Sequence, residues 1–183
     1  AVSMRERHPT VQLVIVGGNH DSASRLDAPA DVLGAIGVTV VGGYEAGRRD
    51  RYLVPVTDND GELAAWVLPV PFLRRSDFAG ALSMAEGYGD IYRRAIDHAA
   101  AHCSTEHALI AMGHCHVAGG AMQESVRNLV RGNEEAVPAS VFDGAHFTAL
   151  GHLHLAQEVA PNVRYCGSPI PLSMSEAGYS HQV

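Results

Sequence analysis

Apolar runs alternate with stretches of helical periodicity along the chain, and this alternation predicts an α/β fold. The first run, residues 11–16, is rich in β-branched side chains and ends at Gly17-Gly18, which is typical of a buried strand that leads into a loop. Three further short apolar runs predict strands over residues 38–41, 109–112 and 147–150.

Two hairpins are predicted from turn-forming residues between short apolar segments. Residues 51–56 and 63–68 flank Asp58-Asn59-Asp60-Gly61, whose side chains tolerate the positive φ of tight turns. Residues 157–159 and 163–165 flank a second turn at Pro161-Asn162.

Helical periodicity places helices between these strands. In residues 26–36 the apolar positions share one face, and Gly37 is suited to the C-cap. A longer helix is predicted over residues 90–102 with Asp90 as its N-cap, and a short one over residues 122–131.

The length of 183 residues is enough for one domain with its own core, and no linker-like segment divides it. No apolar run is long enough for a transmembrane helix, and residues 1–10 contain no apolar signal-peptide region, so we expect a cytoplasmic protein and no membrane partner. The three cysteines have neither the number nor the spacing of a disulfide framework or a zinc knuckle. The net charge of −7 means that a nucleic-acid substrate would need local arginines, bound metal or a partner to supply positive charge.

One pattern occurs three times: a strand ends, glycine follows, and a metal-capable side chain comes next. These loops are Asn19-His20-Asp21, His114 after Gly113, and His152 with His154 after Gly151. If the strands lie side by side, their ends meet and form a ligand site. Glycine before the ligand lets the backbone turn sharply and approach closely.

The donors in these loops mix imidazole nitrogen with amide oxygen, which favours Mn²⁺, Fe²⁺ or Zn²⁺ in an open catalytic site over a closed thiolate zinc site. A lone histidine at a strand end is more often a satisfied polar group than a ligand, but three such loops in one chain make coincidence a poor explanation. His116 is not expected to be a ligand, and Cys115 is expected to be a packing residue. Asp21 either shapes an Asx-turn or helix cap, orients His20, or does both.

The motifs Gly18-Asn19-His20-Asp21 and Gly151-His152-Leu153-His154 resemble two hallmarks of the calcineurin-like metallophosphoesterases. Within that superfamily the segments 68–74, 149–157 and 164–173 resemble SbcD, the family of nuclease subunits of bacterial SbcCD complexes. The last segment is the most specific, because phosphoesterases in general do not share it. The resemblance implies a sandwich of mixed β-sheets flanked by helices.

The resemblance also implies a role for each matching residue. Asn19, His114 and His152 would bind one metal ion, and His154 would bind a second. His20 would act beside the scissile phosphate as proton donor or charge stabiliser, with Asp21 behind it. Two divalent ions are expected, with Mn²⁺ preferred and Mg²⁺, Fe²⁺ or Zn²⁺ as alternatives.

By the same resemblance the parent protein would be a DNA nuclease with exonuclease and endonuclease activity at double-strand ends and hairpins, acting in repair and recombination. Its expected partners are double-stranded DNA and an SbcC-like ATPase subunit, and a homodimer is one further assembly. Arg25, Arg74 and Arg75 are candidate DNA phosphate contacts, with ordinary surface arginine as the alternative.

The chain departs from the family pattern before Asn19, where the motifs Asp-x-His and Gly-Asp would supply three more ligands. We therefore expect residues 1–183 to be a partial nuclease domain, incomplete at the N-terminus, with the C-terminal capping and DNA-binding region absent or curtailed. Two alternatives stay open: a phosphoesterase that acts on nucleotides or phosphoproteins, and an inert α/β scaffold.

Overall fold

The computed structural model describes residues 6–8, 10–78, 83–102, 106–121 and 136–182. Its strands are β1 (Leu13–Val16), β2 (Val38–Val41), β3 (Val54–Thr57), β4 (Leu63–Pro69), β5 (Ala108–His114), β6 (Phe147–Gly151), β7 (Gln157–Ala160) and β8 (Val163–Tyr165). Its helices are α2 (Ala23–Asp27), α3 (Ala30–Gly34) and α4 (Met84–His102), with 3₁₀ turns η1 (Arg49–Tyr52), η2 (Arg75–Asp77), η3 (Ala139–Phe142) and η4 (Met174–Glu176).

The strands form two sheets. Six of them lie in the order β3-β4-β5-β6-β8-β7, in which β4, β5, β6 and β8 are parallel and the edge strands β3 and β7 are antiparallel to their neighbours. The strands β1 and β2 form a separate parallel pair. This confirms the α/β class and the mixed sheet that the resemblance to the calcineurin-like phosphoesterases implies.

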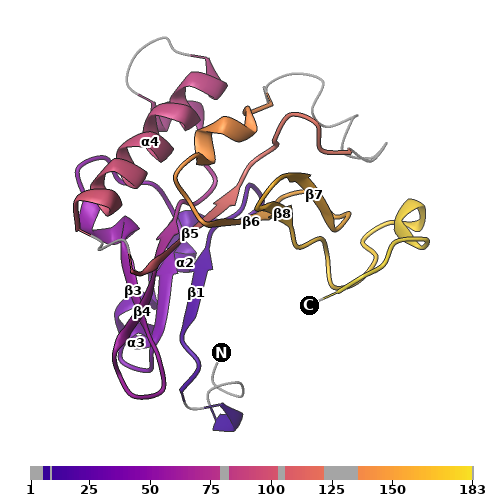
Figure 1. Cartoon of the computed structure of the whole chain (residues 1–183). Coiled ribbons are helices and arrows are strands. Elements are labelled where there is room, and N and C mark those ends of the chain that lie inside the picture. The colour runs from indigo at the N-terminus through magenta and orange to yellow at the C-terminus, as the bar shows by residue number, and fades with distance from the viewer. Residues whose placement is uncertain (1–5, 9, 79–82, 103–105, 122–135, 183) are drawn as a thin grey trace.

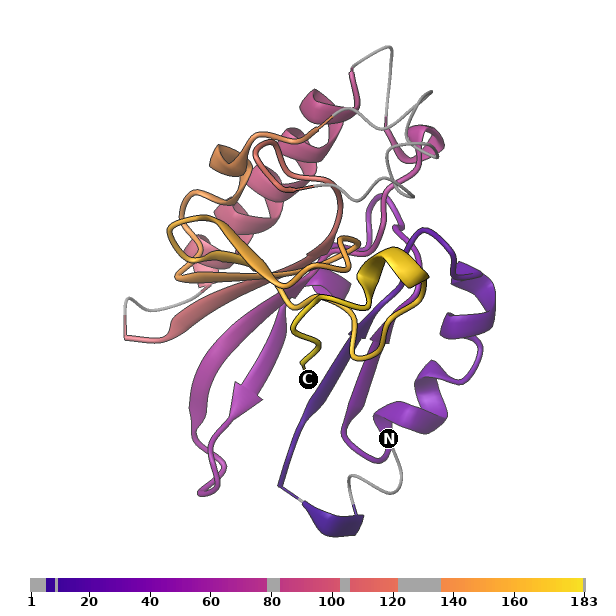
Figure 2. The same cartoon turned by 90° about the vertical axis from the view of Figure 1, so that its right-hand side faces the viewer.

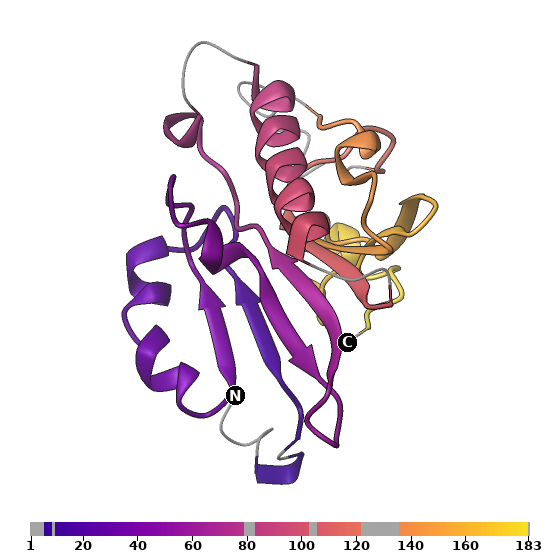
Figure 3. The ribbon, with the colours of Figure 1, turned by 60° about the vertical axis from the view of Figure 1, so that its left-hand side comes forward.

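Each sheet has helices packed against it. The long helix α4 lies over β4 and β5 (Figures 1 and 3), while α2 and α3 flank the β1–β2 pair (Figure 3). The β1–β2 pair lies next to the larger sheet (Figures 2 and 3), and β1 contacts both β4 and β5. The C-terminal segment projects beyond β7 and β8 (Figure 1, yellow).

The main core lies between α4 and the six-stranded sheet. One face of α4 buries Ile91, Tyr92, Ile96 and Ala99, because apolar residues three and four positions apart share a helix face. They face apolar residues of β4, β5 and β6, of which Leu68, Leu109, Ala111 and Leu150 are buried. Burial of each large apolar side chain contributes about 1.5–3 kcal/mol, so this packing holds the carboxyl ends of β5 and β6 in place.

The helix predicted over residues 26–36 is wrong as a single element. The structure contains two short helices, α2 and α3, with Pro29 between them. Proline has no N–H to donate and its ring collides with the carbonyl four residues earlier, so a helix cannot continue through it undisturbed. Gly37 has a φ of +73°, as its predicted capping role requires.

The predicted start of α4 is six residues too late. Asp90 lies inside the helix, where its carboxylate pairs with Arg94 at 2.7 Å. The cap is Ser83, whose hydroxyl accepts the Glu86 N–H at 3.2 Å while the Glu86 carboxylate accepts the Ser83 N–H at 3.0 Å. The Ser83 N–H and the Ser83 hydroxyl, which donates to the same carboxylate at 3.0 Å, hold the pKa of Glu86 below its ordinary value. Ser-x-x-Glu is the capping-box motif, which can be recognised from the sequence alone.

The remaining predicted elements are close to those observed, apart from two differences. Residues 51 and 52 belong to η1, so β3 begins at Val54. β1 is only partly covered, with Ile15 37% exposed, because β2 is its only hydrogen-bonded neighbour among the described strands. The helix predicted over residues 122–131 lies outside the described residues.

Candidate metal centre

The three glycine-preceded loops converge at one place. β5 and β6 are parallel neighbours, and their register pairs His114 with Gly151, so His152 lies one residue beyond His114 on the adjacent strand. β1 reaches the same place from the other sheet: the Phe72 N–H, just after β4, donates to the Gly17 carbonyl at 2.8 Å. The three strands do not all lie in one sheet, because β1 pairs with β2 alone, but their ends do meet.

Three half-buried side chains form what we call the histidine cluster: Asn19, His114 and His152. The Nε2 atom of His114 lies 3.0 Å from the Asn19 Oδ1 atom. The His114 and His152 rings meet edge to face with centroids 5.2 Å apart. Phe72 forms a further wall, with its ring 6.1 Å from that of His114 and nearly perpendicular to it.

Two glycines allow the His114 ring to lie where it does. A Cβ atom on Gly18 would stand 2.7 Å from the ring Cε1, and one on Gly151 would stand 3.0 Å from Nδ1. Both distances are shorter than ordinary carbon contacts, so any side chain at either position would push the imidazole away. The glycines before Asn19 and His152 therefore make room for the neighbouring loop's histidine.

His152 has a backbone conformation that is unusual for its residue type. Its φ is +102°, and the only other non-glycine residue with positive φ in the described chain is Asn162, in the β7–β8 turn. Such a conformation costs of order 1–3 kcal/mol and survives where the surrounding structure imposes it, which is common at functional sites. Asparagine and histidine both adopt positive φ more often than most residues, but mainly near the +64° of Asn162, and the +102° of His152 lies outside that range.

We expect His152→Gly to be more stable than His152→Ala by about 1 kcal/mol. Both variants remove the imidazole, but only alanine keeps the Cβ atom that positive φ disfavours. Urea denaturation of the two purified variants measures the difference. An alanine variant as stable as the glycine variant would show that position 152 is not strained.

The histidine cluster is compatible with one divalent ion. Two ligands bound at about 2.1 Å and at right angles to each other lie roughly 3.0 Å apart, which is the spacing of the Asn19 oxygen and the His114 nitrogen. The donors are one amide oxygen and two imidazoles, a set that suits borderline transition metals. Across the described ranges, no three His, Cys, Asp or Glu side chains converge into a metal-binding group, and the histidine cluster itself contains two such residues together with Asn19.

His154 is held separately, by a carboxylate. Its Nδ1 atom lies 3.0 Å from Oε1 of Glu176, whose side chain is 1% exposed. Desolvation raises the pKa of Glu176, but hydrogen bonds from the Leu172 N–H, His154 and the Ser173 hydroxyl lower it, and the net pKa lies below its ordinary value. The buried group is therefore a carboxylate at neutral pH.

Asp21 shapes the first loop. Its Oδ2 atom accepts the Gly18 N–H at 2.7 Å, and its own N–H donates to the Gly18 carbonyl at 3.2 Å. Asp21 therefore stabilises the turn by bonding backward to Gly18, and not by the predicted Asx-turn or helix cap ahead of Ser22. His20 is exposed and makes no hydrogen bond within the described part of the chain, so its orientation by Asp21 stays a prediction.

A buried tyrosine fixes the loop that carries His114. The Tyr165 hydroxyl donates to the Cys115 carbonyl at 2.7 Å and accepts the Val117 N–H at 2.8 Å. Burial raises the pKa of Tyr165 far above its ordinary value, so the hydroxyl keeps its proton. Cys115 itself is buried in the core, as predicted.

The three candidate phosphate-contacting arginines are all exposed, but they differ in their surroundings. Arg74 donates to the Asp21 carbonyl at 3.3 Å and lies 5.8 Å from the centre of the Phe72 ring, so it is adjacent to the histidine cluster. Arg25 lies on α2, and Arg75 begins η2. The structure thus places Arg74 beside the candidate centre.

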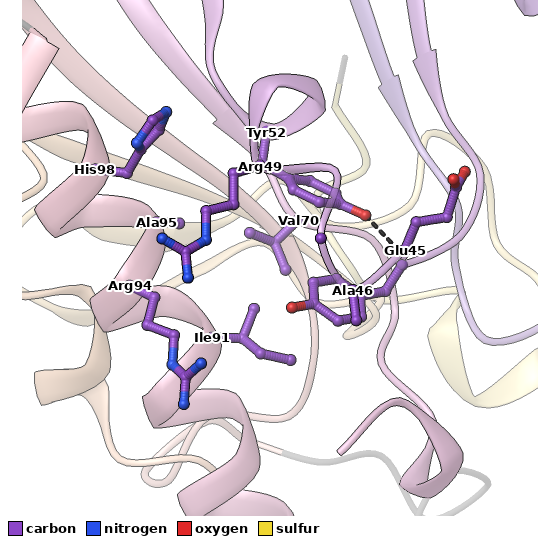
Figure 4. A pocket seen from close by; sticks show the side chains of 11 residues that line it. Glu45, Ala46, Arg49, Tyr52, Val70, Ile91, Arg94, Ala95 and His98 are labelled. Atoms are coloured by element: carbon purple, nitrogen blue, oxygen red, sulfur yellow. Dashed lines mark hydrogen bonds between the residues drawn. The ribbon is translucent and has the colours of Figure 1, made fainter. Parts of the chain in front are cut away.

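A separate cavity of about 140 Å³ lies between η1 and α4 (Figure 4). Arg49, Arg94 and His98 lie around an aliphatic floor that includes Val70 and Ile91. Glu45 lies at its edge, with its carboxylate paired to Arg51 outside it. Because Asp90 already neutralises Arg94, the cavity is not strongly basic, and it contains no residue of the histidine cluster.

Sequence reasoning missed three residues that build this region: Phe72, Tyr165 and Glu176. Tyr165 lies inside the specific segment 164–173, and Glu176 follows that segment by three residues. The position of Tyr165 and Glu176 in or just after that segment was the sequence signal of their importance. Nothing in the local sequence reveals which side chains they contact.

No helix in the described part of the chain is long and apolar enough to cross a membrane. No family model matches the chain. Among curated proteins it is 40% identical to the SbcD component of the SbcCD nuclease of Rhodobacter capsulatus, over 96% of this chain and 47% of that protein. The corresponding SbcD proteins of Escherichia coli K12 and Bacillus subtilis 168 are 35% and 33% identical over 93% and 100% of this chain. The chain spans about half the length of these relatives.

Proposed function

We infer that the protein carrying this chain is a metal-dependent nuclease of double-stranded DNA, because the chain belongs to the SbcD family over nearly its whole length. The observation that carries the proposal is the convergence of Asn19, His114 and His152 from three separate strand ends. That arrangement brings two imidazoles and an amide oxygen together at half-buried positions, which are therefore partly accessible to solvent.

Each residue has a proposed part in the hydrolysis. Asn19, His114 and His152 would hold one divalent ion, Mn²⁺ by preference, and His154 would contribute to a second. When bound, such ions activate a water molecule and stabilise the charge on the phosphate oxygens. Water adds to phosphorus and gives up one proton to solvent as the bond to the leaving sugar oxygen breaks, and that oxygen takes up a proton. His20, exposed beside the histidine cluster, can donate it as an imidazolium.

Charge supports a partnered enzyme. The chain carries a net charge of −7, and Arg74 lies beside the histidine cluster. Binding DNA through its phosphates requires more positive charge than this single arginine supplies. We therefore propose that an SbcC-like ATPase subunit supplies most of the DNA-binding surface, either to one nuclease subunit or to a homodimer.

A substrate panel tests this proposal. The full gene product, with and without its ATPase partner, is given linear duplex DNA, a DNA hairpin, a cyclic nucleotide and a phosphopeptide, each with Mn²⁺ or with EDTA. We expect cleavage of the duplex and the hairpin with Mn²⁺ and none with EDTA. Turnover of the cyclic nucleotide or phosphopeptide alone would support the other class of phosphoesterase, and inactivity on all four would support an inert scaffold.

A further inference from the structure

Glu176 is the one charged residue among the buried residues that the structure describes. Burial of an ionised carboxylate is costly unless hydrogen bonds replace its lost water. Both carboxylate oxygens of Glu176 accept hydrogen bonds: Oε2 accepts the Leu172 N–H at 2.9 Å, and Oε1 accepts the Ser173 hydroxyl at 2.9 Å. Oε1 also lies 3.0 Å from His154 Nδ1.

The segment that carries Glu176 is tied back to His154 by a second route. The ring of His181 lies with Nε2 3.1 Å from the Glu176 carbonyl oxygen and Nδ1 3.0 Å from the Ser168 carbonyl oxygen. The Ser168 N–H in turn donates to the His154 carbonyl at 2.9 Å. Both the backbone and the ring of His154 are thus fixed to the same C-terminal segment.

A carboxylate can only accept a hydrogen bond, so its position selects one form of the His154 ring. Nδ1 must carry a proton, and in the neutral ring this leaves the lone pair on Nε2. Histidines that bind metals commonly have this arrangement, because a carboxylate on the far nitrogen fixes the tautomer and makes the near nitrogen a stronger donor.

We propose that Glu176 is a positioning residue that fixes the ring and tautomer of His154, so that Nε2 is available to a divalent ion. This rests on the proposed function, since it assumes that His154 binds metal. It adds a residue outside the Asn-His-Asp and His-x-His motifs, and it explains why a carboxylate is buried at position 176.

The test uses the full gene product and the isosteric variant Glu176→Gln. Glu158→Gln is the matched control, because it makes the same change at an exposed carboxylate on β7. Calorimetric titration with Mn²⁺ measures affinity, and ¹⁵N NMR of the metal-free protein reports the His154 tautomer. For Glu176→Gln we expect Mn²⁺ binding weakened by about 10–100-fold and a mixture of tautomers. For Glu158→Gln we expect neither.

The outcomes separate the two proposals. If the wild-type protein binds no Mn²⁺, the proposed function fails, and the metal role of Glu176 fails with it. If the wild-type protein binds Mn²⁺ and Glu176→Gln binds it equally well, or keeps a single tautomer, only the positioning role is overturned. Should Glu176→Gln not fold, Glu176→Asp retains the charge but withdraws it from Nδ1, and weaker Mn²⁺ binding is again the expected result.

Discussion

His114→Ala should abolish metal-dependent DNA cleavage, with a loss of more than about 100-fold. Changes in residues that merely support a metal ligand cost about 10–100-fold, and His114 is proposed as a ligand itself. It is also the centre of the histidine cluster, because it contacts Asn19 at 3.0 Å and the His152 ring at a centroid distance of 5.2 Å. Calorimetric titration with Mn²⁺ and cleavage of linear duplex DNA should both show the loss.

A histidine at the opposite end of the same strand provides the control. His107 directly precedes β5, whereas His114 ends it, so we expect His107→Ala to bind Mn²⁺ and cleave DNA nearly as the wild type does. His20→Ala should differ from both: as a proposed proton donor, His20 affects cleavage but not metal affinity. Full cleavage by His114→Ala would contradict the candidate metal centre, and full cleavage by His20→Ala would contradict the role of His20 alone.

The candidate centre was predictable from the sequence because its signals are local. Strand, glycine and ligand follow one another within a few residues around Asn19, His114 and His152, and the parallel order of β5 and β6 then brings two of the loops together. The close approach of Gly18 and Gly151 to the His114 ring is the physical reason for two of the three glycines, while a Cβ atom on Gly113 would collide with the Tyr92 hydroxyl. A strand-end pattern is thus informative even before the strand order is known.

What the sequence did not reveal depends on contacts between distant segments or on overlooked local rules. β1 lies in its own sheet with β2, and no periodicity in residues 11–16 distinguishes that from a place in the larger sheet. The contact between His154 and Glu176 joins residues that are 22 positions apart, with β7 and β8 between them. Pro29 and the Ser83–Glu86 capping box, in contrast, were visible locally, and each corrects a helix boundary by a known rule.

Tyr165 connects stability to the candidate centre, because it holds the chain just after His114. Its side chain is fully buried, and its hydroxyl bonds to both Cys115 and Val117, which are buried as well. Tyr165→Phe would leave a carbonyl and an N–H without that partner, each at a cost of about 1–3 kcal/mol. We expect the free energy of unfolding to fall by about 2–4 kcal/mol in urea denaturation.

The same substitution should also weaken Mn²⁺ binding, because the loop that orients His114 loses both of its tyrosine hydrogen bonds. Tyr179→Phe is the matched control, since the Tyr179 hydroxyl makes no hydrogen bond within the described residues and its removal should change neither quantity. A Tyr165→Phe variant that is less stable but binds Mn²⁺ as the wild type does would show that Tyr165 contributes to stability and not to metal binding. A variant with unchanged stability would mean that other groups satisfy the Cys115 carbonyl and the Val117 N–H once the hydroxyl is gone.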